Sequence, residues 1–264
     1  MEHIKKMNDT LKIALFGTVF GQLEELMTTL SDFCSEHNID ETHGFDHAVA
    51  VAENASIAME CWNTPINIHI RLMIILASLL HDVDDKKYFP DSINYSNAKK
   101  LLNLCFENIF TKKDIKQIIN MIDLVSASKN KDMIPKKTPQ WMLIPRYSDR
   151  LEAIGIIGLK RNLGYTIEKG MPLFLETTEK ACSIDDIELI ATKERYENYN
   201  GISDSMLGHI YDKLLHIKNF PVKNDYFNFE CKKRMEPFIN FVLKFGRNEI
   251  ATVDDIKTFI DECN

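Results

Sequence analysis

The stretch LMIILASLLHDVDDKKY, from Leu72 to Tyr88, decides the fold expected for this chain. The stretch begins with a run of apolar and small residues. This run ends abruptly at His81 and Asp82, and further charged residues follow before Tyr88. An apolar run of this kind predicts a buried helix, so we expect the His–Asp pair at or near the end of a core element. Because buried charge is costly unless it is paired or bound to a metal, the simplest interpretation is a metal site.

The composition is that of an ordinary globular protein. The 264 residues suffice for one large domain or two small ones, and we expect a single domain over residues 1–264. Apolar residues make up 45% and charged residues 27% of the chain. The net charge of -7 argues against a nucleic-acid polymer as partner, because such binding requires a basic face. A small phosphorylated substrate remains compatible with this charge, because a local group of cations and a metal can override it.

The cysteines favour a reducing compartment. The six cysteines are scattered along the chain without a CxxC pair, which indicates buried thiols in an intracellular, cytoplasmic protein rather than a disulfide framework. No apolar run approaches the roughly 20 residues of a membrane helix, so we expect no membrane partner. The sequence does not indicate the oligomeric state.

Hydrophobic periodicity predicts an all-α fold, because strand-like alternation is nearly absent. Thr64 and Pro65 are expected to open the helix that leads to His81, and Thr111 and Asp114 resemble a capping box. Turn-forming residues predict an irregular flap at about 164–203. The expected helices cover residues 20–36, 45–61, 66–80, 92–110, from 112 onward, 141–159, 205–217, 225–245 and 254–263, with a short helix possible within 184–196.

Four residues form the candidate metal site: His47, His81, Asp82 and Asp149. Two neutral imidazoles and two carboxylates carry a formal charge of about -2, which balances a divalent cation, and such mixed ligands suit Mn, Fe, Co, Mg or Zn. Adjacent helical residues point about 100° apart, so His81 and Asp82 can reach one ion where their helix ends. Taken singly, each residue fits a helix cap or a polar pair in the core; taken together, they predict a metal site.

Several stretches resemble a known family. THGFDH at 42–47, the His81–Asp82 pair and the distant Asp149 resemble the H…HD…D signature of the HD-domain metal phosphohydrolases. The resemblance extends over about residues 40–245 to small bacterial HD hydrolases that include nucleoside triphosphate pyrophosphohydrolases. Two differences are Gly44, where that group usually has Asp, and a longer segment at 176–203. The matching stretches are HDVDDKK at 81–87, IDLVSASK at 122–129, YSDRLEAIGIIGLKR at 147–161 and GHIYDKLLHIKN at 208–219.

The resemblance implies a single HD-domain helical bundle with additional C-terminal helices. The HD core would span about 40–165, the flap about 164–203 and the C-terminal helices 204–264. It also implies one divalent ion, with Mn favoured, on the four residues named above. The expected reaction is cleavage of a (deoxy)nucleoside triphosphate to monophosphate and pyrophosphate by metal-activated water.

Six further residues are candidates for catalysis or substrate binding. Asp85 would orient the water or move its proton, while Lys87 and Arg150 offer cations to phosphate oxygens. His209 and Lys213, spaced i and i+4, share one helix face and would close over the phosphate chain. His43 is a further candidate for contact with the substrate.

Other functions stay open at the level of sequence. HD proteins also include 5′-nucleotidases and hydrolases of guanosine tetraphosphate-type alarmones. A catalytically silent nucleotide-binding module would be expected to lack at least one ligand, and none is lacking here. A helical scaffold for protein partners would leave the ordered polar motifs unexplained.

Overall fold

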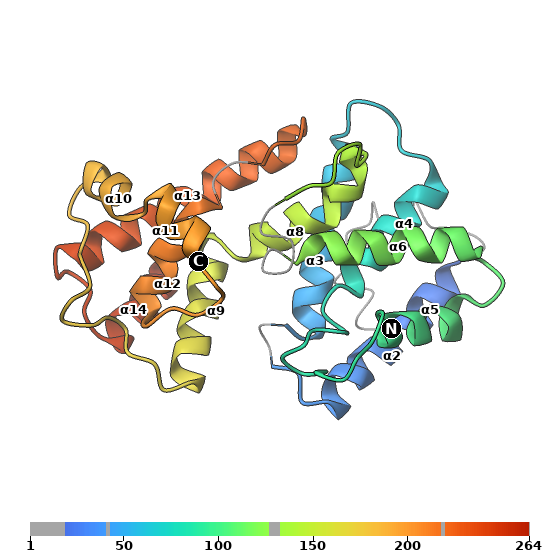
Figure 1. Cartoon of the computed structure of the whole chain (residues 1–264), viewed down its shortest axis with the longest axis horizontal. Coiled ribbons are helices and arrows are strands. Elements are labelled where there is room, and N and C mark those ends of the chain that lie inside the picture. The colour runs from blue at the N-terminus through green and yellow to red at the C-terminus, as the bar shows by residue number, and fades with distance from the viewer. Residues whose placement is uncertain (1–18, 41–42, 127–132, 218–219, 264) are drawn as a thin grey trace. The chain divides into compact units, whose positions relative to one another are not determined.

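The structure is a computed structural model, and it describes residues 19–40, 43–126, 133–217 and 220–263. Every element in these ranges is a helix, which confirms the predicted all-α class (Figure 1). The end of the IDLVSASK stretch and Thr42 lie outside the described residues. The chain divides into two compact units, residues 1–149 with 222–226 and residues 150–221 with 227–264. The single domain expected from the sequence stays a prediction.

The first unit is built around α4 (Ile68–Leu79), whose residues from Leu72 to Leu79 are all buried. This helix packs against α3 (Phe45–Glu60) and α6 (Lys112–Val125), while α2 (Phe20–Glu36) packs against α5 (Ser96–Phe106). The predicted apolar core helix is therefore confirmed. The unit also contains η2 (Gln140–Leu143) and most of α8 (Ile144–Glu152).

The start of α4 differs from the prediction. Asn67, rather than Thr64, is the N-cap, and its side chain accepts a hydrogen bond from the His69 backbone N–H at 2.8 Å. Asparagine is among the strongest N-cap residues, so the cap at position 67 determines the first turn. The predicted capping box of Thr111 and Asp114 is present at the start of α6.

The second unit holds the remaining helices. The one long helix expected over 141–159 is divided, because Gly155 has φ +73° and Ile154 is extended, so the chain turns between α8 and α9. The irregular segment starts after α9 and contains two short helices, α10 and α11. The elements of this unit are α9 (Gly155–Glu168), α10 (Ile184–Ile190), α11 (Lys193–Asn198), α12 (Met206–Asp212), η3 (Leu214–His216), nearly all of α13 (Asp225–Gly246) and α14 (Val253–Glu262).

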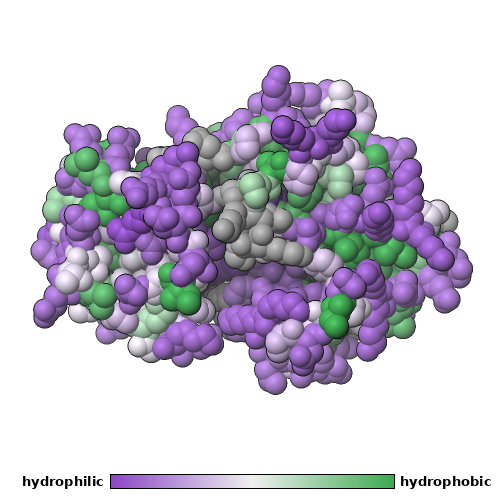
Figure 2. Space-filling view, in the orientation of Figure 1, coloured by the Kyte–Doolittle hydropathy of each residue, from purple (hydrophilic) through white to green (hydrophobic). Residues whose placement is uncertain are grey.

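The surface carries both hydrophilic and hydrophobic side chains, as in other globular proteins. Hydrophilic side chains cover most of the face shown in Figure 2, and hydrophobic ones gather between them in small groups. In the described part of the chain, no helix combines the length and the apolar character needed to cross a membrane.

Candidate metal centre

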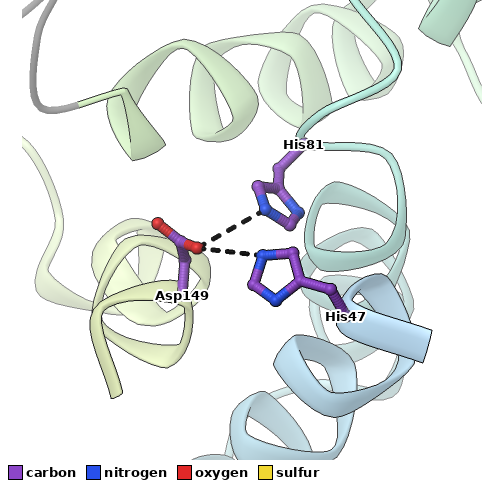
Figure 3. Close-up of side chains that lie close together, drawn as sticks. All are labelled: His47, His81 and Asp149. Carbon is purple, nitrogen blue, oxygen red and sulfur yellow. Dashed lines mark ion pairs between the residues drawn. The ribbon is translucent and has the colours of Figure 1, made fainter. Parts of the chain in front are cut away.

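His47, His81 and Asp149 converge in the first unit, although they come from three separate elements (Figure 3). His47 lies in the first turn of α3, His81 follows directly after the end of α4, and Asp149 lies in α8. Nε2 of His47 is 3.2 Å and Nε2 of His81 is 3.6 Å from the same carboxylate oxygen, Oδ1 of Asp149. Ligand atoms bound about 2.1 Å from one ion lie about 3.0–3.4 Å apart, so the spacing fits a shared cation.

Asp82 lies beside this group. Its Oδ2 is 3.2 Å from Nε2 of His81 and 3.8 Å from Nε2 of His47. The imidazoles are almost completely buried, whereas the side chains of Asp82 and Asp149 are 20% and 27% exposed. The group therefore has a dry nitrogen side and a carboxylate side that is open to solvent. A role for Asp82 as a fourth ligand stays a prediction.

A backbone carbonyl orients His81. Nδ1 of His81 donates a hydrogen bond to the Ser78 carbonyl at 2.8 Å, because a carbonyl oxygen can only accept. Nε2 therefore faces the carboxylates, where it is buried and makes no hydrogen bond of acceptable geometry within the described residues. A metal-binding histidine usually donates its other N–H to a carbonyl or carboxylate. This arrangement, and the N/O donor set, fit a divalent metal ion.

The charges of the group are tightly linked. Burial lowers the pKa of His81, but the negative charge of Asp82 and the contact with Asp149 outweigh it, so that this pKa lies well above its usual range. Burial raises the pKa of Asp82, yet His81 lowers it to about 2. The pKa of Asp149 falls well below its usual value, because the two histidines outweigh burial. The carboxylates therefore stay ionised and attract positive charge to the imidazoles.

The position of Asp149 depends on the anchoring of α8. Arg146, which is only 1% exposed, donates a hydrogen bond from Nη1 to the Leu124 carbonyl of α6 at 2.9 Å. Because Arg146 precedes Asp149 by three residues in α8, this bond ties the carboxylate-bearing helix to α6. A helical Asp149 in a mostly apolar segment was predicted from the sequence, but no motif indicated the bond from Arg146 that anchors its helix.

The structure places the other candidates in two groups. Asp85 and Lys87 lie in the turn after α4, where Oδ1 of Asp85 accepts a hydrogen bond from the Lys87 backbone N–H at 2.7 Å. His43 lies next to the metal group, with its ring centroid 6.5 Å from that of His47. Their roles in catalysis and substrate binding stay predictions.

The remaining candidates belong to the second unit, namely Arg150 in α8 and His209 and Lys213 in and just after α12. The Lys213 backbone N–H bonds to the His209 carbonyl at 3.1 Å, as expected for one helical turn. Burial, and then the charge of Lys213, lower the pKa of His209 to about 4, so its ring is neutral at pH 7. Binding of substrate by these residues also stays a prediction.

Comparison with known proteins places the chain in a family. Protein L803 of Acanthamoeba polyphaga mimivirus is 39% identical to it over 231 residues, which cover 82% of this chain and 93% of the viral protein. The chain belongs to the same family as L803. No protein-family model matches the present chain.

Solved structures show the fold of this L803-family protein. An HD-superfamily hydrolase from Bacillus thuringiensis superposes with a TM-score of 0.57 at 23% identity, over 86% of this chain and 98% of the hydrolase. YpgQ from Bacillus subtilis, in complex with ADP, superposes with a TM-score of 0.58 at 20% identity, over 90% of this chain and all of YpgQ. The chain therefore has the HD-domain fold that its motifs predicted.

Proposed function

We propose that this protein is a metal-dependent phosphohydrolase that acts on nucleotides. The observation that carries the proposal is the convergence of His47, His81 and Asp149 on one point of the HD-domain fold, with Asp82 beside them. A divalent ion held there would lower the pKa of a water molecule bound to it and would polarise a phosphoryl oxygen of the substrate. Mn is the ion that the resemblance favours, and these ligand types also suit Mg, Co, Fe and Zn.

The finer proposal is cleavage of a (deoxy)nucleoside triphosphate into monophosphate and pyrophosphate. The ADP complex of the structurally similar YpgQ supports a nucleotide as ligand, and the HDVDDKK and HIYDKLL stretches support the pyrophosphohydrolase branch. A small nucleotide also agrees with the net charge of -7, because its binding needs local cations rather than a broad basic face.

We assign the steps of the reaction to the chain's own residues. Asp85 orients the attacking water and accepts its proton, since it follows His81 by four positions in the turn after α4. Lys87 and Arg150 offset the charge of the phosphate chain. In the second unit, neutral His209 accepts a hydrogen bond from the substrate, while Lys213 contributes a further cation.

The test is a product assay on the purified full chain. The protein is incubated with every ribo- and deoxyribonucleoside mono- and triphosphate in the presence of Mn, Mg or Co, and pyrophosphate is resolved from orthophosphate. The proposal expects pyrophosphate plus monophosphate. Orthophosphate released from monophosphates would instead identify a 5′-nucleotidase. Absence of any product with every metal, despite one bound ion per chain, would refute the proposed reaction.

Matched variants separate the roles. His81→Asn should remove activity together with metal binding, which also excludes a contaminating phosphatase. Asp85→Asn should keep the metal and lose most turnover, because the amide oxygen can still accept the Lys87 N–H bond but the side chain can no longer take up a proton. Lys87→Ala should raise KM in the product assay. An unchanged KM would exclude Lys87 as a substrate-binding residue.

A further inference from the structure

Asp40 joins two segments that are far apart in the sequence. Its Oδ2 accepts a hydrogen bond from Nζ of Lys87 at 2.7 Å and another from the Tyr88 hydroxyl. Its Oδ1 lies 3.2 Å from Nδ1 of His43. The chain just before α3 and the turn after α4 are therefore connected through one carboxylate.

Both connected segments carry residues of the metal centre. His47 follows Asp40 by seven positions, at the start of α3, and His81 and Asp82 precede Lys87 in the turn after α4. A contact that fixes the separation of the two segments also fixes the separation of their ligands. Nε2 of His47 and Oδ2 of Asp82, which come from opposite segments, lie 3.8 Å apart.

We propose that Asp40 is a positioning residue for the metal centre. Together with Lys87 and Tyr88 it forms a clamp, here called the Asp40 clamp, which holds the start of α3 at the correct distance from the His81–Asp82 turn. The proposal rests on the metal site of the proposed function and deepens it, because it gives Lys87 a role before any substrate binds.

The backbone at Gly44 lies close to the backbone of Asp40. A Cβ atom at Gly44 would lie 3.0 Å from the Asp40 carbonyl oxygen, which is tighter than ordinary van der Waals contact. A side chain at position 44 would therefore displace the Asp40 backbone. Gly44 therefore leaves the Asp40 backbone where its carboxylate reaches Lys87 and Tyr88.

The clamp is partly exposed, which sets its expected strength. The side chains of Asp40 and Lys87 are 23% and 29% exposed, so solvent screens their attraction. Its effect should therefore appear as altered ligand geometry rather than as a large loss of global stability. Residues that orient metal ligands typically change metal affinity by about 10- to 100-fold, and we expect the lower end of this range.

The experiment measures the Mn²⁺ dissociation constant of the full chain by calorimetry, without nucleotide. Asp40→Asn, which keeps the shape but removes the charge, should raise the dissociation constant about tenfold. Asp40→Glu should restore affinity to within about threefold, because the carboxylate is retained. The control is Glu60→Gln, which breaks the Glu60–Arg71 ion pair of the same unit at the other end of α3, about 20 Å from His47.

Lys87→Met separates the clamp from simple charge effects. Removal of a positive charge near the site should strengthen Mn²⁺ binding if only long-range electrostatics acts. The clamp instead predicts weaker binding, and the double variant Asp40→Asn/Lys87→Met should lose no more affinity than the weaker-binding single variant.

Three results would overturn the proposal: an Asp40→Asn affinity equal to that of the wild type, an equal loss in Glu60→Gln, or tighter binding by Lys87→Met. None of these measurements involves hydrolysis. A protein that binds Mn²⁺ through the clamp but cleaves no nucleotide would refute the proposed function and leave the clamp intact.

Discussion

Gly155 allows the chain to turn between α8, which carries Asp149, and α9, and its replacement by alanine should destabilise the protein. Its φ of +73° lies in the left-handed region, which costs a residue with a Cβ atom about 1–2 kcal/mol. The new Cβ would also lie 3.0 Å from Cβ and 3.3 Å from the carbonyl oxygen of Arg234. Overpacking of this kind adds about 1 kcal/mol or more, so Gly155→Ala should lower the free energy of unfolding by about 2–4 kcal/mol in total.

The matched control lies in the same helix. Apart from the backbone of its own helix, Gly164 of α9 has no atom within 4 Å of the position that its Cβ would take, and its φ is not positive. Gly164→Ala should therefore stabilise the protein by up to about 1 kcal/mol, through helix propensity alone. In thermal unfolding followed by circular dichroism, each kcal/mol corresponds to about 2–4 °C for a chain of this size. A Gly155→Ala midpoint at or above that of Gly164→Ala would refute the account of the turn.

Three further predictions concern the metal centre and α4. Asp82→Ala should weaken Mn²⁺ binding and nucleotide hydrolysis together, by about 100-fold or more, and full activity in the product assay would exclude Asp82 as a ligand. Asn67→Ala should lower the free energy of unfolding by about 1 kcal/mol through loss of the α4 cap, as measured by urea denaturation; an unchanged midpoint would contradict the cap. In the folded protein, the pKa of His81 lies well above its usual range. Protonation of His81 therefore stabilises the metal-free folded state. This contribution is fully present below about pH 6.5 and is lost as the pH rises through the raised pKa. The melting midpoint in chelator should therefore fall as the pH rises above about 6.5. Mn²⁺ affinity should rise over the same range, because the ion competes with that proton. A midpoint that is independent of pH would contradict the prediction, and His81→Asn should flatten the curve.

Local patterns predicted those elements whose formation depends on local sequence. The apolar run before His81 can be satisfied only by burial on all sides, so the core position of α4 and the place of the His–Asp pair followed from sequence. The capping box of Thr111 and Asp114 is likewise a local arrangement of hydrogen bonds. Thr64 was a wrong prediction, because α4 begins only at Ile68, where the Asn67 side chain caps its first turn.

Features that depend on distant contacts were predicted only where a motif marked them. The periodicity of residues 141–159 continues across Gly155, so the sequence did not reveal the turn that the positive φ creates. Three of the predicted ligands lie together because α3, α4 and α8 bring them there, and only the motif order indicated this. No sequence pattern indicated the contacts of Asp40 with Lys87 and of Arg146 with Leu124, because these partners are 47 and 22 positions apart.

The proposed metal centre draws its ligands from three places in the chain, which links folding to the supply of the ion. His47 and His81 are 34 positions apart, and Asp149 follows 68 positions later, so the unfolded chain has no comparable site. An ion that binds only the folded state adds about 2.7 kcal/mol of stability at a free concentration 100 times its dissociation constant. The folded population, and with it resistance to proteolysis, should then track the free metal concentration around the protein. Scarcity of the ion would remove the protein itself as well as its activity.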